Sequence, residues 1–215
     1  CDNASSDGSL DRIKEWAAGI IISDIYDNNP LKHLTKPFLP KPVNYYEYRY
    51  ADLIKHKSFQ TLSNAPLILI DSGSNLGFAG GNNAGVKFAQ LNDDYSAIWF
   101  LNNDTVIDKD TLTELAAYSA KYRDSGKKIG MIGSKLLYYD RPDTIQGCGG
   151  IYYRSLAYSR HIGTGSIDNG QYDQDDLKMD YIIGASMFVP REFIDDVGLM
   201  NEEYFIYFEE TDWIV

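Results

Sequence analysis

The residues best suited to chemistry are the polar triplet Asn102-Asn103-Asp104, which follows the apolar run at residues 96–101. An apolar run of this length is typical of a buried strand, so Asp104 would present one carboxylate at the strand's C-terminal end. Open α/β sheets bind ligands, nucleotides among them, at this edge. Taken alone, the triplet is better explained as a turn that caps the next helix. Three further motifs reverse that preference.

A short polar segment near the start of the chain holds Asp2, Asn3 and Ser5. Short polar side chains of this kind bond either to local backbone or to an incoming ligand. A turn that caps the following helix explains the segment equally well. Both interpretations stay open for this segment by itself.

A glycine-rich segment covers residues 75–85 and leads into a predicted helix. Adjacent glycines before a helix let a ligand approach the backbone closely and aim backbone amides at an anion. The segment is not a Walker loop, because no Lys-Ser or Lys-Thr follows the glycines. It is also a poor match to a dinucleotide-binding fingerprint. It indicates an anion-binding turn outside these two classes.

The last motif joins Gly184-Ala185 to an acidic and aromatic run over residues 197–213. The run places carboxylates close to aromatic side chains, where desolvation raises the pKa of a carboxyl toward the range useful to a general base. A solvated acidic face is the alternative, and the interleaved aromatic residues count against it. The run is therefore a candidate source of a general base.

The composition indicates a globular protein with no nucleic-acid partner. Its 215 residues fit one domain, 44% of them are hydrophobic and 24% are charged. A net charge of −11 argues against binding nucleic acid or anionic lipid, since both favour clustered Lys and Arg. Two distant cysteines, Cys1 and Cys148, favour a reducing compartment. No apolar run is long enough to cross a bilayer. We expect a cytoplasmic protein, or one at the inner face of the membrane.

Strands and helices alternate along the chain. Buried strands are predicted over residues 66–71, 96–101, 128–137 and 181–190, and helices over residues 11–18, up to Leu91, 111–123 and 191–197. Residues 28–50 are rich in Pro, Lys and Tyr and are interpreted as an irregular insertion. Residues 138–180 show no clean period. This order predicts a parallel sheet covered on both faces early in the chain, and a mixed sheet later.

In this order and spacing, the four motifs resemble those of the family-2 glycosyltransferases with the GT-A fold. The resemblance extends in particular to the bacterial rhamnosyltransferase-like members that build cell-surface polysaccharide. It covers nearly the whole chain apart from residues 28–50. It implies an α/β fold with a mostly parallel central sheet flanked by helices, in a single domain over residues 1–215. It also implies a chain that lacks the first strand and the C-terminal end of that domain.

The resemblance assigns the donor side of the site. Asn102-Asn103-Asp104 is similar to the family's Asp-X-Asp motif, with Asn in place of the first acid, so Asp104 would hold Mg²⁺ or Mn²⁺. Hard cations of this kind prefer oxygen ligands. Many relatives carry Arg where this sequence has Asn82. The nucleotide-binding residues that the resemblance implies are Asp2, Asn3, Ser5, Asn75, Gly77, Gly80, Gly81, Asn83 and Asn103.

The resemblance also assigns the reaction side. Glu210 matches the family's general base, with Glu in place of the usual Asp, and Glu209 and Asp212 are further catalytic candidates beside it. The acceptor-binding residues implied are Gly184, Ala185 and Trp213.

The implied reaction is inverting transfer of a sugar from a dTDP- or UDP-sugar donor to a saccharide or lipid-linked acceptor. Glu210 would deprotonate the acceptor hydroxyl that attacks the anomeric carbon. A homodimer is compatible with this function. Two other functions stay open on the sequence alone. One is a sugar-phosphate nucleotidyltransferase, which would need a basic glycine-rich loop near the N-terminus. The other is a truncated, non-catalytic domain that binds nucleotide or assembles with a partner.

Overall fold

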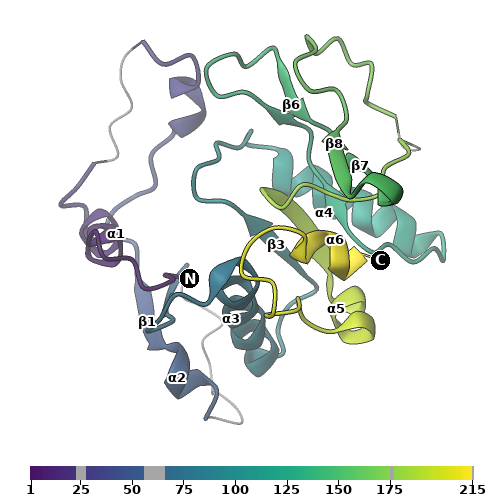
Figure 1. Ribbon diagram of the computed structural model, residues 1–215. Coiled ribbons are helices and arrows are strands. Elements are labelled where there is room, and N and C mark those ends of the chain that lie inside the picture. Colours follow the sequence, from purple (N-terminus) through teal and green to yellow (C-terminus); the bar gives the residue numbers. More distant parts are fainter. Residues whose placement is uncertain (23–27, 56–65, 175–176, 215) are drawn as a thin grey trace. The chain divides into compact units, whose positions relative to one another are not determined.

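The computed structural model describes residues 1–22, 28–55, 66–174 and 177–214 and shows a mixed α/β protein (Figure 1). The chain falls into two compact units. Unit 1 comprises Cys1–Tyr26, Pro37–Ser96 and Leu199–Glu209, and unit 2 comprises Asp27–Lys36, Ala97–Gly198 and Glu210–Val215. The single domain over residues 1–215 stays a prediction.

Unit 1 is built on a parallel pair of strands. Strand β2 (Leu67–Asp71) pairs in parallel with β1 (Tyr45–Arg49), with Tyr45 opposite Leu67 and Arg49 opposite Asp71. The apolar run of β2 is the kind of sequence that buried parallel strands use. Its C-terminal residue, Asp71, also forms a parallel bridge with Asp2.

Unit 1 contains the helices α1 (Ser9–Ala18), α2 (Tyr50–Leu53) and α3 (Gly77–Asn92). Helices α2 and α3 pack against these strands. Leu53 and Ala84 are buried together with Ile70 of β2, and Tyr48 and Phe88 pack on this cluster. The core therefore fixes α3 on the strand pair.

Strand β1 lies inside residues 28–50, where the sequence predicts an irregular segment. That prediction is wrong for Tyr45–Arg49, which pairs with β2 along its full length. Aromatic residues favour extended backbone when one side of the strand can pack, and Tyr48 packs on the core of unit 1. An earlier part of the same range forms the short 3-10 helix η1 (Lys32–Thr35), which belongs to unit 2.

The main sheet of unit 2 is antiparallel. Strand β9 (Ser186–Pro190) lies between β3 (Ala97–Leu101) and β4 (Ile132–Gly133) and pairs antiparallel with both. Every residue of β9 is buried, as expected for a central strand. Because β3 and β4 are both antiparallel to β9, they run in the same direction.

Helices and small hairpins complete unit 2. Leu115 of α4 (Thr111–Asp124) and Ile194 of α5 (Arg191–Val197) are buried. Helix α6 (Glu209–Ile214) lies near the end of the chain. The remaining elements are β5 (Leu136–Leu137), β6 (Ile145–Gly147), β7 (Gly150–Tyr153), η2 (Arg154–Leu156) and β8 (Tyr158–His161).

Three sequence predictions for unit 2 need correction. The strand predicted over 128–137 is broken into β4 and β5, because β4 pairs with β9 whereas β5 pairs with β6. The strand predicted over 181–190 is shorter and begins at Ser186. Residues 138–180, which show no sequence period, contain β6 and the β7–β8 hairpin.

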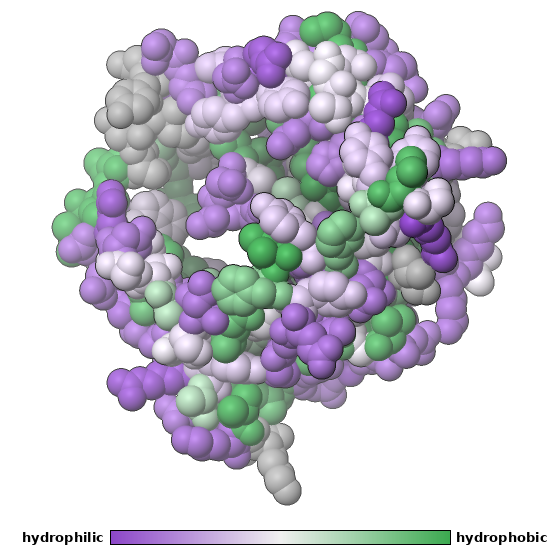
Figure 2. All heavy atoms as spheres, viewed as in Figure 1, coloured by the Kyte–Doolittle hydropathy of each residue, from purple (hydrophilic) through white to green (hydrophobic). Residues whose placement is uncertain are grey.

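The mixed α/β class is confirmed, whereas a mostly parallel central sheet is not seen among the described strands. There, parallel pairing joins β1 to β2 and Asp2 to Asp71, and the sheet of β3, β9 and β4 is antiparallel. On the face shown in Figure 2, hydrophobic residues occur in small groups among hydrophilic ones. Within the described residues, none of the helices has both the length and the apolar character that a membrane span requires.

Candidate functional site

The first residues of the chain lie against the end of β2. The backbone N–H of Asp2 donates to Ile70 O at 2.7 Å, and Ser72 N–H donates to Asp2 O at 3.0 Å. The Asp2 carboxylate accepts a hydrogen bond from Ser5 N–H at 3.1 Å. The structure therefore brings Asp2 and Ser5 to the C-terminal edge of a parallel strand, which is where α/β proteins bind ligands.

The side chain of Asn3 joins this strand end to the glycine-rich segment. Its Oδ1 accepts a hydrogen bond from Leu76 N–H at 2.9 Å. Its Nδ2 donates to Asn75 Oδ1 at 3.0 Å and to Gly77 O at 2.9 Å. Asn3 and Asn75, both predicted to bind nucleotide, are therefore in direct contact, and their hydrogen bond is exposed. Their role in binding a nucleotide stays a prediction.

The glycines of this segment make room for neighbouring chain. Gly77 has a φ of +71°, and a Cβ there would lie 3.0 Å from the C and Cα atoms of Phe205 and closer still to its O. A Cβ on Gly81 would lie 3.4 Å from the side-chain amide of Asn3. A Cβ on Gly80 would overlap the side chain of Leu76, one turn earlier in the chain. These glycines do allow a close approach to the backbone, but the atoms that approach belong to the protein and not to a ligand.

The first backbone amides of α3 are already bonded within the protein. Gly77 N–H donates to Asn75 Oδ1 at 3.0 Å, and Phe78 N–H donates to Phe205 O at 2.9 Å. Helix N-terminal amides bind anions only when they have no other partner. The expectation that the glycine-rich segment aims its amides at an anion is therefore corrected at these two positions.

Asn83 is bound to a segment distant in sequence, Leu199–Glu209, which we call the acidic segment. Its side chain is 1% exposed. Its Nδ2 donates to Met200 O at 2.8 Å and to Glu202 Oε1 at 3.0 Å, and its Oδ1 accepts from Met200 N–H at 3.1 Å. Both amide hydrogens are therefore used, and the nucleotide contact predicted for Asn83 finds no donor left on this side chain.

Lys87 extends this network along α3, and sequence reasoning did not single it out. Its ammonium donates to Tyr50 OH at 2.7 Å and to Glu202 Oε1 at 3.2 Å. The signal that could have found it is its spacing from Asn83, since residues four apart share one face of a helix. Burial works to lower the pKa of Lys87, but the hydrogen bonds to Tyr50 and Glu202 outweigh it and leave that pKa raised.

The charge state of Glu202 follows from the same contacts. The hydrogen bond from Asn83 is the largest cause that holds the pKa of the Glu202 carboxyl below its ordinary value. Burial opposes this shift, and Lys87 adds to it. Glu202 is therefore held as a carboxylate, in the state that both donors require.

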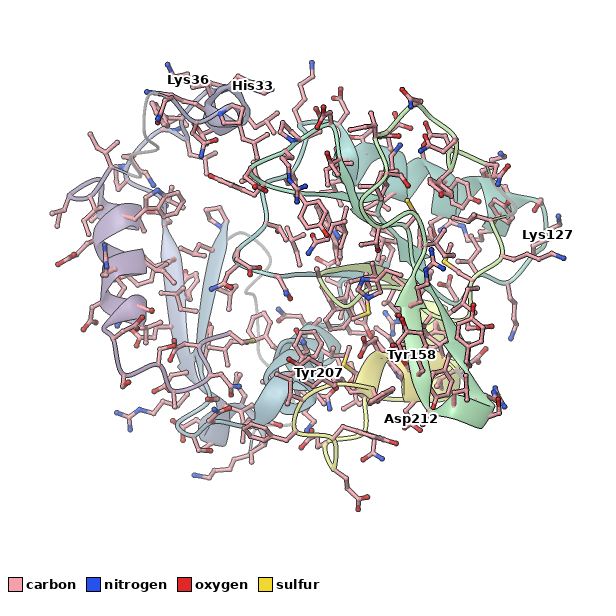
Figure 3. All side chains as sticks on the ribbon, turned by 45° about the horizontal axis from the view of Figure 1, so that its top comes forward. His33, Lys36, Lys127, Tyr158, Tyr207 and Asp212 are labelled. Carbon is pink, nitrogen blue, oxygen red and sulfur yellow. The ribbon has the colours of Figure 1, made fainter. Side chains whose placement is uncertain are left out.

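Phe205, Tyr207 and Phe208 of the acidic segment are exposed. Phe205 is 58% exposed and Tyr207 is 71% exposed, and Tyr207 lies on the loop before α6 (Figure 3). Tyr207 and Phe208 have φ angles of 71° and 69°, a left-handed conformation that costs about 1–2 kcal/mol per bulky residue. Glu202 and Glu203 are exposed as well. The expectation that the aromatic rings desolvate these two carboxylates is therefore wrong.

Glu209 is the buried carboxylate of the run. Its side chain is 4% exposed, and its Oε2 has no hydrogen-bond partner among the described residues. A buried carboxylate oxygen without a partner is energetically costly, and such groups occur where a protein keeps a carboxylate for function. Glu209 therefore keeps its place among the catalytic candidates.

In unit 2 the chain turns directly after β3. Asn102 N–H donates to Ala185 O at 3.0 Å, and Asn102 O accepts hydrogen bonds from Thr105 N–H at 3.3 Å and from Thr105 Oγ1 at 2.6 Å. Asn103 and Asp104 lie in this turn and are exposed. The structure therefore brings the triplet beside Ala185, which together with Gly184 forms the turn into β9.

Asp104 supplies one exposed carboxylate at this turn. It does not cap a helix, because α4 begins at Thr111 with Asp110 at its N-cap. A single carboxylate fits Mg²⁺ or Mn²⁺ that is shared with a diphosphate, since such ions are held by one or two carboxylates, waters and phosphate oxygens. The described residues contain no group of three or more His, Cys, Asp or Glu side chains that could hold a metal by themselves.

Trp213 is a core residue of unit 2. Its ring is 6% exposed and meets Phe100 and Phe193 edge-on, with ring centroids 5.7 and 5.3 Å apart. Its Nε1 donates to Gly198 O at 2.9 Å. A ring packed in this way is not available to stack on a sugar, so the acceptor contact predicted for Trp213 is corrected to a packing role.

Glu210 is half-buried, and Asp212 is exposed on α6 (Figure 3). Burial raises the pKa of the Tyr181 hydroxyl, and the negative charge of Glu210 adds to the shift. Tyr181 packs closely on Gly150, where a Cβ would overlap its ring. No motif marks Tyr181 in the sequence, and its place near Glu210 is visible only in the folded chain.

Comparison with known proteins gives two findings. No family model matches the chain. Over 155 residues, or 72% of this chain, the sequence is 24% identical to the low-salt glycan biosynthesis hexosyltransferase Agl10 of Haloferax volcanii. The match covers 47% of that protein, so the chain spans about half the length of the curated relative it matches.

Proposed function

We propose that this protein is a glycosyltransferase of glycan synthesis, which moves a sugar from a nucleotide-diphosphate sugar to a saccharide or lipid-linked acceptor. The observation that carries the proposal is the likeness to a hexosyltransferase over 155 residues. The order of the four motifs supports the same conclusion through its resemblance to the family-2 glycosyltransferases of the GT-A fold. We therefore propose that fold for this protein, and surface polysaccharide as its product.

The donor side of the proposal rests on the strand-end cluster of unit 1. Asp2, Asn3 and Asn75 lie together at the C-terminal edge of β2, and the Asn3–Asn75 hydrogen bond is exposed. Exposed amide and carboxylate groups at such an edge suit the hydrogen-bonding groups of a base and ribose. The donor in this proposal is a UDP- or dTDP-sugar.

The chemistry rests on two carboxylates. Asp104 would hold Mg²⁺ or Mn²⁺, and a bound cation would neutralise charge on the leaving diphosphate. Glu210 would accept the proton of the acceptor hydroxyl. The acceptor oxygen then bonds to the anomeric carbon as the bond from that carbon to the diphosphate oxygen breaks. Attack from the face opposite the leaving group inverts the anomeric configuration.

The test is a screen of the whole protein with UDP- and dTDP-sugars for hydrolysis and for transfer to saccharide acceptors. Glu210→Gln keeps the side-chain shape but removes the proton acceptor, so kcat should fall by about 10²–10⁴ with donor binding nearly unchanged. Glu203→Gln is the matched control, because Glu203 is an exposed carboxylate of the same run. Its kcat should stay near that of the unmodified protein.

Two results would change the proposal. If Glu210→Gln keeps near-normal turnover while Glu209→Gln or Asp212→Asn is inactive, the base is the latter residue. If the whole protein neither hydrolyses nor transfers from any donor, the glycosyltransferase proposal fails and a non-catalytic binding domain takes its place.

A further inference from the structure

The acidic segment, Leu199–Glu209, is held on α3 at successive positions along the helix. In the first turn, Phe78 N–H donates to Phe205 O at 2.9 Å, and the backbone of Gly77 approaches the same residue. Further along, Asn83 bonds to both the backbone N–H and the backbone O of Met200. One turn later, the ammonium of Lys87 reaches Glu202, which Asn83 also contacts. The helix therefore fixes the path of the segment over residues 200–205.

Asn83 is the buried member of this set. Its amide holds Met200 in both directions, as a neighbouring strand would, with the N–H bonded at 3.1 Å and the O at 2.8 Å. The adjacent Asn82 differs, since its Nδ2 donates within α3 to Phe78 O at 3.1 Å. Removing the Asn83 amide would leave buried groups of Met200 without partners, a cost specific to this position.

The first turn of α3 also touches the predicted donor residues. Gly77 O accepts a hydrogen bond from Asn3 Nδ2 at 2.9 Å, while a Cβ on Gly77 would meet the backbone of Phe205. The same glycine thus contacts the strand-end cluster and the acidic segment. Helix α3 is a rigid element shared by both.

We propose that Asn83 is a positioning residue and not a nucleotide contact. It anchors on α3 the acidic segment, whose last residue is the catalytic candidate Glu209. The catalytic consequence rests on the proposed function, whereas the anchoring does not.

Amide hydrogen exchange in the whole protein tests the anchoring without any substrate. Asn83→Ala removes the acceptor of the Met200 N–H, so exchange of that amide should quicken by roughly tenfold, the effect of losing about one hydrogen bond. Asn82→Ala is the matched control and should leave Met200 exchange unchanged. Lys87→Met is a second variant at a half-buried position, and it should quicken exchange around Glu202 by a smaller factor, because it removes one ion pair that is partly exposed.

Binding and turnover separate positioning from nucleotide contact. With UDP and dTDP as probes, Asn83→Ala should change Kd by less than about twofold while kcat falls, because the side chain acts on the acidic segment. Lys87→Met should follow the same pattern if Asn83→Ala does not fold.

Met200 exchange unchanged in Asn83→Ala would overturn the anchoring. A Kd for UDP or dTDP raised in proportion to the loss of kcat/KM would instead make Asn83 a nucleotide contact. If the protein has no transferase activity at all, Met200 exchange still decides the anchoring, so failure of the proposed function and failure of this inference are distinguishable.

Discussion

The contact between Gly77 and Phe205 can be tested by adding one methyl group. Gly77 has a φ of +71°, and its Cβ position lies 3.0 Å from the C and Cα atoms of Phe205. Gly73 offers a matched comparison, because its φ is +73° and nothing lies within 4 Å of its Cβ position. Gly73→Ala and Gly77→Ala therefore impose the same backbone strain, but only Gly77→Ala meets a neighbour.

The magnitudes follow from these geometries. Placing Ala in the left-handed region costs about 1 kcal/mol in both variants. In Gly77→Ala the obstacle is backbone, so the acidic segment must move and lose the 2.9 Å hydrogen bond from Phe78 to Phe205, worth about 1 kcal/mol. Overpacking adds about 1–3 kcal/mol. Gly77→Ala should therefore be less stable than Gly73→Ala by about 2–4 kcal/mol.

Thermal denaturation measures the difference. For a chain of this size, each kcal/mol lowers Tm by about 2–4 °C, so Gly77→Ala should unfold at least about 4 °C below Gly73→Ala. Amide exchange over residues 200–205 should also quicken in Gly77→Ala alone. Equal Tm values for the two variants would refute the close approach of Gly77 and Phe205 and, with it, the anchoring of the acidic segment at the start of α3.

Three further variants test the ion pair of Glu202, the packing of Trp213 and the ion pair of Lys135. The hydrogen bond from Asn83 holds the pKa of Glu202 low, so its stabilisation is present above the unfolded-state pKa and is lost as pH falls through the folded-state pKa. The Tm difference between the unmodified protein and Glu202→Gln should therefore be largest near neutral pH and vanish in acid. Trp213→Phe should lower stability by about 1–2 kcal/mol in urea denaturation, because the buried ring loses its hydrogen bond and some packing. Lys135→Met should lower stability in the same assay, since it leaves Asp168, whose side chain is 19% exposed, without its 2.7 Å ion pair.

Local periodicity predicted the helices and two of the strands well. The helix predicted over 191–197 is α5 (Arg191–Val197), and the one over 111–123 is α4 (Thr111–Asp124). A helix is stabilised by hydrogen bonds between residues close in sequence, so the local pattern is enough to predict both. Strand β1 was missed because its order comes from pairing with β2 and from Tyr48 packing on the core, neither of which is a local signal.

In the candidate site, too, some contacts could be anticipated from the sequence and others depend on residues that are far apart in the chain. The contact between Asn3 and Asn75 could be anticipated, because segments that follow parallel strands meet at one edge of a sheet. The burial of Asn83 could not, because its partner Met200 lies 117 residues further along the chain. The packing of Trp213 likewise depends on Phe100 of a separate strand. An aromatic residue near carboxylates in sequence need not lie near them in space.

The proposed function requires that this protein binds a nucleoside diphosphate through a cation held by a carboxylate. The most direct measurement is calorimetric titration of the whole protein and of Asp104→Ala with UDP and dTDP, with and without Mn²⁺. Asp104 is exposed, so the variant should keep the fold and its Tm. We expect Mn²⁺-dependent binding of at least one nucleotide by the unmodified protein and loss of that dependence in Asp104→Ala. Mn²⁺-dependent affinity that is unchanged in Asp104→Ala, or absence of binding to both nucleotides, would contradict it.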